Sequence, residues 1–272
     1  MQAPMTELLE PYLARLGITG TLSPTPEALL ALHRAHALGV PYENLDVQLG
    51  QPLTTDPAGA LAKLAAGRGG WCYEMNGAFG AALTLLGFSV TRLAGGVQRA
   101  ALGDAVLGNH LVLKVVIDGA ALLCDVGFGD GLLEPIPLQE GHYRQGALGF
   151  RLQRLDDGLW RFHGDARTGG APSFDFADAP ADEALLARQC AALQSAPESP
   201  FVLNAVVQRH RPDGHVALRG RVLRTLTTDG VRERTLDGPD DYAATLVREF
   251  GLELPAAALW PRIVARHAAL FG

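Results

Sequence analysis

The chain has 272 residues, 48% of them hydrophobic and 19% charged, a composition typical of a globular protein with a sizeable core. Its formal net charge is −6 and it shows no basic stripe, which argues against a nucleic-acid partner. No apolar run approaches the roughly 18 residues that a membrane-spanning helix needs, and the N-terminal segment lacks the basic start and apolar core of a signal peptide.

The first part of the chain, up to about residue 86, is predicted to be helical. Apolar residues recur at helical spacing in four segments, 6–17, 23–39, 56–67 and 72–86. The second begins with cap-type residues and a proline and stops at Gly39, and the fourth stops before Gly87. Residues 40–53 are predicted to be an irregular connection.

Strand patterns dominate from about residue 88. The strand-like segments are 88–97, 110–117, 121–128, 201–210, 215–220, 222–228 and 231–236. Residues 151–164 alternate around an Asp-Gly turn, which is a strong hairpin signal. The helical patterns are 181–193, 240–251 and 259–271.

The order of these elements indicates an α+β protein. We expect a helical domain at 1–86, a β-rich, barrel-like domain at 87–194 and an α/β lid domain at 195–272.

Cys72 is a candidate nucleophile because two glycines precede it and a predicted helix starts at it. Unpaired N–H groups and the helix dipole at such a position favour a thiolate. The same N–H groups can stabilise an oxyanion. The alternative is that Cys72 is a small buried hydrophobic residue, as most free cysteines are.

His110 and Asp125 are predicted to meet across a hairpin. If Asp118-Gly119 forms a two-residue turn, Ile117 pairs with Ala120. In that register His110 and Asp125 are diagonal neighbours on one face, within reach of an imidazole–carboxylate hydrogen bond. A carboxylate fixes the histidine tautomer and stabilises imidazolium, which in turn stabilises a thiolate. A three-residue turn would place them on opposite faces.

The other two cysteines are predicted to be packing residues. Cys124 neighbours Asp125 and points the other way, and Cys190 lies in a helical segment. Free thiols without an export signal suggest a reducing compartment, so we expect a cytoplasmic protein. The histidines show no metal-ligand spacing with cysteine, and no bound metal is expected.

Four motifs in the same order as in a known family carry a resemblance. They are VPYENLDV (40–47), RGGWCYEMN (68–76), His110 with DVGFG (125–129), and SAPESPFVLNAVVQR (195–209). With these motifs the chain resembles the arylamine N-acetyltransferases, from near residue 10 to its C-terminus. The first motif carries Tyr42 where phenylalanine is usual in the family.

The resemblance implies the three-part architecture above, with a catalytic core like that of cysteine proteases and transglutaminases. It implies ping-pong transfer from acetyl-CoA, as co-substrate, to an arylamine, arylhydrazine or hydrazide, with no metal or prosthetic group. Carried over by position, Cys72 is the nucleophile, His110 the base and Asp125 the residue that orients it. The positions that match the family's acceptor pocket are Tyr42, Phe128 and Phe201. Gly127 matches the position where the family's backbone approaches CoA.

Other readings of the sequence stay open. The same fold serves an amide synthase or a transferase with another acyl donor, and the same three residues serve a thiol hydrolase. Arg68 is expected to form a structural ion pair with Glu43, or alternatively to contact a CoA phosphate. Glu74 is either a first-turn acid or, with Asn76, part of a buried polar network.

Overall fold

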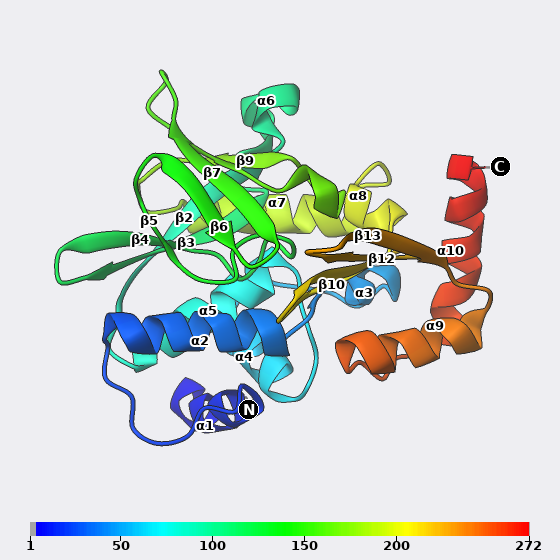
Figure 1. Cartoon of the computed structure of the whole chain (residues 1–272), viewed down its shortest axis with the longest axis horizontal. Helices are drawn as coiled ribbons and strands as arrows, with labels where there is room; N and C mark the ends of the chain where they lie inside the picture. Colours follow the sequence, from blue (N-terminus) through cyan, green and yellow to red (C-terminus); the bar gives the residue numbers. More distant parts are fainter. Residues whose placement is uncertain (1–3, 272) are drawn as a thin grey trace.

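The computed structural model describes residues 4–271, so the outer ends of the first and third predicted domains, 1–3 and 272, lie outside the described residues. A helical region comes first, followed by a near-closed eight-stranded antiparallel barrel and then a five-stranded sheet with helices (Figure 1). This arrangement confirms the predicted α+β fold. The boundaries at residues 86 and 194 stay predictions.

The four predicted N-terminal helices are present. They are α1 (Met5–Arg15), α2 (Pro26–Gly39), α4 (Pro57–Ala65) and α5 (Cys72–Leu85). Helix α2 begins where the Thr25 side chain accepts from the Ala28 N–H, and Asp56 caps α4 in the same way. Helix α5 is buried along most of its length and packs against α1, α4 and strand β3.

The prediction of an irregular connection at 40–53 is wrong. This segment contains strand β1 (Tyr42–Glu43) and helix α3 (Leu45–Gln48). The strand was missed because two residues are too few to show alternation, and its partner β10 (Val206–Arg211) lies far along the chain.

The barrel sheet follows the order β5-β4-β3-β2-β9-β8-β7-β6. Its strands are β2 (Ser89–Val97), β3 (His110–Ile117), β4 (Ala120–Cys124), β5 (Ile136–Pro137), β6 (Gly141–Gln145), β7 (Leu148–Arg154), β8 (Trp160–His163) and β9 (Ser173–Phe176). Short helical turns lie at Arg99–Leu102 (α6), Asp104–Val106 and Ala166–Thr168. The expected hairpin is present, because β7 pairs with β8 around Asp157-Gly158.

The register of the β3–β4 hairpin is as predicted. Ile117 pairs with Ala120, and Asp118 and Gly119 both have positive φ, at 50° and 78°. Residues of one face, such as Leu113 and Cys124, pack against the helices. Residues of the other face, such as Val112, pack in the barrel interior.

The C-terminal sheet follows the order β1-β10-β11-β12-β13. Its remaining strands are β11 (Gly214–Arg219), β12 (Val222–Thr227) and β13 (Gly230–Thr235). The helices of this part are α7 (Glu183–Ser195), α8 (Pro200–Leu203), α9 (Pro239–Thr245) and α10 (Ala256–Phe271), with a π-helical turn at Leu246–Phe250. The strand predicted at 201–210 is wrong in its first part, which forms α8 because Pro200 and the Ser199 cap start a helical turn.

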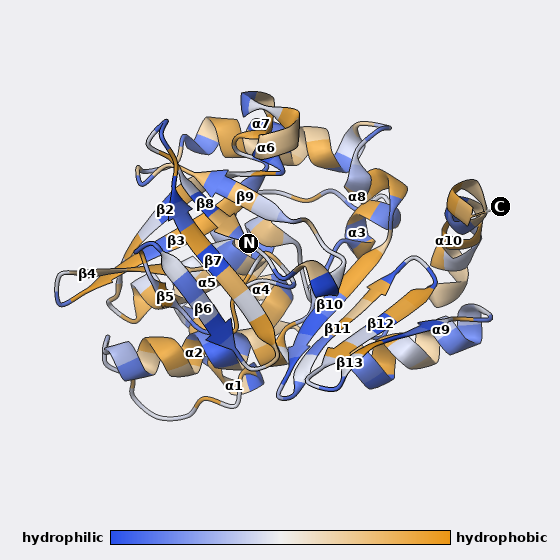
Figure 2. Ribbon diagram, turned by 45° about the horizontal axis from the view of Figure 1, so that its top comes forward, coloured by the Kyte–Doolittle hydropathy of each residue, from blue (hydrophilic) through white to orange (hydrophobic). Residues whose placement is uncertain are grey.

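Helices α2, α9 and α10 each carry both hydrophobic and hydrophilic residues (Figure 2), as expected when one face meets the core and another meets solvent. None of the helices within residues 4–271 has the combination of length and apolar character that crossing a membrane requires.

Candidate active site

Cys72 is the first residue of α5, as predicted. Its side chain is buried, and its Sγ lies 3.9 Å from the carbonyl oxygen of Asn109. The start of the helix is fixed by Glu74, whose Oε2 accepts from the Trp71 N–H at 3.3 Å. The thiol is therefore held at the positive end of a well-anchored helix.

His110 and Asp125 meet as the hairpin register predicts. The His110 Nε2 donates to Asp125 Oδ2 at 2.7 Å, and both side chains are almost fully buried. His110 opens β3 and Asp125 directly follows β4, so the same turn that sets the register also sets this contact. Because Nε2 is engaged, Nδ1 is the ring nitrogen left for Cys72.

The charge on His110 is set by two opposing effects. Burial lowers the pKa of the imidazole, because a charged ring loses its hydration. The negative charge and hydrogen bond of Asp125 outweigh burial, Cys72 adds to them, and together they raise the pKa of His110 to about 10. The ring therefore carries a proton at neutral pH and holds its positive charge beside the cysteine.

Asp125 is itself held by a buried polar network. Its Oδ1 accepts from Asn76 Nδ2 at 2.7 Å and from the Gly127 N–H at 2.8 Å. Asn76 also donates to the Leu111 carbonyl oxygen at 2.6 Å. The structure thus places Asn76 in the predicted network, where it fixes the carboxylate toward His110.

His33 is a member of this network that the sequence did not single out. Its Nε2 accepts from the Asp125 N–H at 3.2 Å and its Nδ1 donates to the Leu133 carbonyl oxygen at 3.1 Å. Burial lowers the pKa of His33 to about 4, so the ring stays neutral. In the sequence, the only indication of a structural role for His33 was its position on the buried side of a predicted helix.

A second network, made of ion pairs, supports the start of α5. The predicted pair is present, because Arg68 Nη2 lies 2.7 Å from Glu43 Oε1, and it also lies 2.7 Å from Asp46 Oδ1. Lys63 joins Asp46 at 2.7 Å to Glu74 at 2.8 Å. Burial, together with Glu43 and against the opposing effect of Lys63, raises the pKa of Glu74 to about 6.

The network gives Glu74 both predicted roles, a first-turn acid and a buried polar group. Asp46 and Lys63 were missed, because nothing in their local sequence shows that they converge on Glu74.

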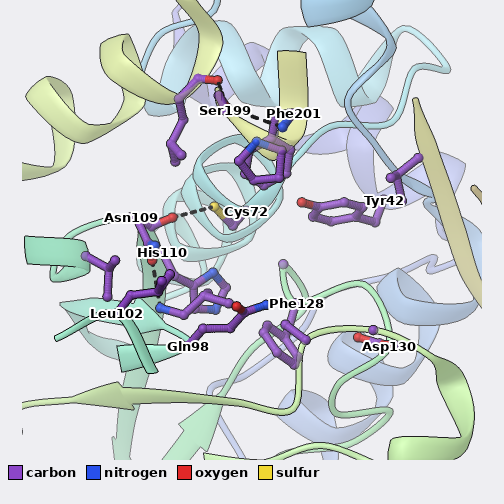
Figure 3. Close-up of a pocket in the computed structure, with 18 of the residues that line it drawn as sticks. Tyr42, Cys72, Gln98, Leu102, Asn109, His110, Phe128, Asp130, Ser199 and Phe201 are labelled. Carbon is purple, nitrogen blue, oxygen red and sulfur yellow. Dashed lines mark hydrogen bonds between the residues drawn. The ribbon is translucent and has the colours of Figure 1, made fainter. Parts of the chain in front are cut away.

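A cavity of about 620 Å³ opens beside Cys72 and His110. Its wall includes every predicted substrate and CoA position, namely Tyr42, Phe128, Phe201 and Gly127. Figure 3 shows Tyr42, Phe128 and Phe201 arranged around Cys72. Gly127 packs against the start of α5, and a Cβ added there would lie 2.9 Å from the Cα of Cys72. The close approach to α5 therefore gives a reason for glycine that does not depend on CoA.

One wall of the cavity carries polar groups that the sequence did not predict. Asp130 is buried there, and its Oδ2 accepts from Thr168 Oγ1 at 2.6 Å. Arg219 lies 3.6 Å from the same oxygen and donates to Gln208 Oε1 at 2.8 Å. Burial raises the pKa of Asp130, although Arg219 acts in the opposite direction. The indication that the sequence offered for Asp130 was its position directly after the DVGFG motif.

Cys124 and Cys190 are buried, as predicted for packing residues, and burial raises the pKa of each thiol. A thiol that meets a charged imidazole and a carboxylate at a cavity wall is the arrangement of enzymes that act through a cysteine nucleophile.

Comparisons with known proteins show similarity to N-acetyltransferases. A profile described as N-acetyltransferase matches residues 25–259. The arylamine N-acetyltransferase of Mycolicibacterium smegmatis is 35% identical over 258 residues, covering 89% of this chain and 91% of the relative. The structure of the Mycobacterium marinum arylamine N-acetyltransferase in complex with CoA superimposes with a TM-score of 0.83 at 29% identity, covering 94% of this chain and 98% of that one.

A relative with a different name is also similar. The proansamycin X synthase of Amycolatopsis mediterranei is 30% identical over 252 residues, covering 88% of this chain and 95% of the relative. On the profile match and the identities above, the chain belongs to the arylamine N-acetyltransferase family and is an enzyme of that family.

Proposed function

We propose that the protein moves an acetyl group from acetyl-CoA to an arylamine, arylhydrazine or hydrazide through a thioester on Cys72. The observation that carries this proposal is the 2.7 Å contact between His110 and Asp125, which holds a charged imidazole beside the thiol. Cys72 is the nucleophile, His110 the acid and base, and Asp125 the residue that orients and charges His110.

In the first half-reaction the Cys72 sulfur attacks the acyl carbon of acetyl-CoA, and the carbonyl electron pair moves to oxygen. Collapse of this intermediate breaks the bond to the CoA sulfur, which takes the proton from His110. In the second half-reaction neutral His110 accepts a proton from the attacking amine. The Cys72 thiolate then leaves, and His110 keeps its proton for the next cycle.

The acceptor is proposed to lie in the cavity against the aromatic rings of Tyr42, Phe128 and Phe201. These rings offer an apolar surface to an aromatic amine, and offset or edge-on ring contacts favour such a guest. The backbone at Gly127 is the proposed approach for the CoA thiol end. The Mycobacterium marinum relative solved in complex with CoA supports acetyl-CoA as the co-substrate.

Thiol, imidazole and carboxylate together supply the nucleophile and the proton transfers of this reaction, so the proposed mechanism uses no metal or prosthetic group. The three cysteines are unpaired, which fits a reducing compartment, and we propose a cytoplasmic location.

The test is an intact-mass spectrum after brief incubation with acetyl-CoA and no acceptor, for wild type and Cys72→Ala. A single acetyl adduct in wild type, absent from the variant and removed by an added arylamine, is the expected result. Release of CoA at full rate without an acceptor would instead identify a thiol hydrolase.

A second candidate is an enzyme of the same fold with another acyl donor, such as an amide synthase. The similarity to a protein named proansamycin X synthase favours keeping this candidate. No adduct from acetyl-CoA, with Cys72 still reactive toward an alkylating agent, would favour this candidate over the first.

A further inference from the structure

The hydroxyl of Tyr42 is a polar group at the cavity wall for which the proposed mechanism gives no role. Tyr42 is 7% exposed and lines the cavity together with Cys72 and His110. A hydroxyl that faces a cavity beside a nucleophile is placed to donate a hydrogen bond to a group bound there.

The backbone holds Tyr42 firmly in place beside the nucleophile. Strand β1 pairs Tyr42 with Gln208 of β10, and a bridge joins Tyr42 to Gly70, two residues before Cys72. The ring packs in the same buried cluster as Cys72 and Phe201. The position of the hydroxyl relative to the thiol is therefore set by the fold rather than by a flexible loop.

Figure 3 shows the hydroxyl end of Tyr42 pointing across the cavity toward Cys72, while His110 approaches Cys72 from another side. An acyl group attached to the sulfur would therefore lie between an imidazole and a phenol. The imidazole is engaged in proton transfer, which leaves the phenol free to face the acyl oxygen.

The hydroxyl stays protonated in this place. Burial raises the pKa of Tyr42 well above its usual value, and the neighbouring Cys72 and Asp130 act in the same direction. A phenol that keeps its proton remains a hydrogen-bond donor at every pH at which the enzyme would be assayed.

We propose that the Tyr42 hydroxyl is a catalytic group that donates a hydrogen bond to the acyl oxygen, most strongly when that oxygen becomes negative. This inference rests on the proposed thioester chemistry. When the Cys72 sulfur bonds to the acyl carbon, the electron pair on oxygen is held by the Tyr42 O–H, and no proton leaves Tyr42. When the electron pair on oxygen re-forms the carbonyl bond, the carbon–sulfur bond to CoA breaks, and His110 gives its proton to the CoA sulfur.

The same oxyanion forms in both half-reactions, so the hydroxyl acts in both. Peptide N–H groups at the start of α5 can contribute further donors, which makes the loss of one hydroxyl partial. We expect about a tenfold slower rate in each half-reaction, the effect of one neutral hydrogen bond.

The experiment compares wild type with Tyr42→Phe, which removes one oxygen and keeps the ring. Acylation is followed with p-nitrophenyl acetate and no acceptor, and deacylation by adding an arylamine to the isolated acetyl-enzyme. Alkylation of Cys72 by iodoacetamide, which forms no oxyanion, reports on the nucleophile alone. Tyr143→Phe is the matched control, because its hydroxyl donates to the Gln139 carbonyl oxygen outside the cavity.

The expected result is that Tyr42→Phe slows acylation and deacylation by similar factors and leaves alkylation unchanged. Unchanged rates in both half-reactions would overturn the proposal. A loss confined to deacylation would also overturn it, because the hydroxyl would then contact the acceptor instead. The ester donor keeps this test separate from the proposed function: a wild type that accepts the ester but not acetyl-CoA refutes the donor, not the role of Tyr42.

Discussion

Replacing Asp125 by asparagine removes one charge and changes almost no volume, so it isolates what the carboxylate does. The asparagine oxygen can still accept from Asn76 and from the Gly127 N–H, as Oδ1 of Asp125 does. Its NH2 group then faces His110 Nε2, which must become an acceptor. The variant therefore keeps the fold but favours the wrong histidine tautomer and no longer supports imidazolium.

The size of the effect follows from the pKa of His110. Without the Asp125 charge, burial is the dominant influence, and it lowers the pKa of His110 from about 10. We expect acetyl transfer to fall by about 10³–10⁴-fold, as when a triad aspartate becomes asparagine.

The assay pairs turnover with iodoacetamide alkylation of Cys72 at pH 7. The thiolate is the form that alkylates, and a charged imidazole beside it favours that form, so alkylation of Asp125→Asn should fall well below the wild-type rate. Asp130→Asn is the matched control, since it removes a buried carboxylate from the same loop, and Asp130 bonds to Thr168 rather than to His110. Equal alkylation of wild type and Asp125→Asn, with equal unfolding midpoints, would refute the reasoning.

Three further predictions concern the supports of the site. Lys63→Met leaves the carboxylate of Glu74 without its cation and should cost about 3 kcal/mol in urea unfolding, whereas an unchanged midpoint would contradict a structural role. His33 takes up a proton near pH 6.5 in the unfolded chain but only near pH 4 in the folded protein. Its contribution to the free energy of unfolding should therefore be complete above pH 6.5 and fall by about 3 kcal/mol as the pH drops toward 4. Urea unfolding of His33→Gln should show a smaller loss of stability over this pH range. Gly127→Ala places a methyl group 2.9 Å from the Cys72 Cα and should slow acetylation of Cys72, measured by intact mass, by about a hundredfold. A wild-type rate would show that the α5 contact is not restrictive.

The part of the site that the sequence predicts is local. The contact between His110 and Asp125 follows from one turn, because a two-residue loop at Asp118 and Gly119 determines which side chains share a face. The start of α5 follows from glycines before an apolar helical pattern. In both cases the deciding interactions lie within a few residues of each other, and local conformational preference is enough.

The missing parts of the site depend on contacts between distant segments. His33 meets Asp125 across 92 residues of chain, and Thr168 donates to Asp130 across 38. Short-range patterns carry no information on such pairs, because they form only when separate elements pack. Strand β1 shows the same limit, since its existence depends on β10.

Gly127 connects the two halves of the site. Its N–H donates to Asp125 Oδ1, so it helps to orient the carboxylate, and a Cβ added to it would lie 2.9 Å from the Cys72 Cα. Any displacement of this residue moves the carboxylate and the nucleophile relative to each other. The DVGFG motif therefore does more than supply the acidic residue Asp125. It is the segment through which the barrel fixes the distance between the helix that carries the thiol and the hairpin that carries the imidazole.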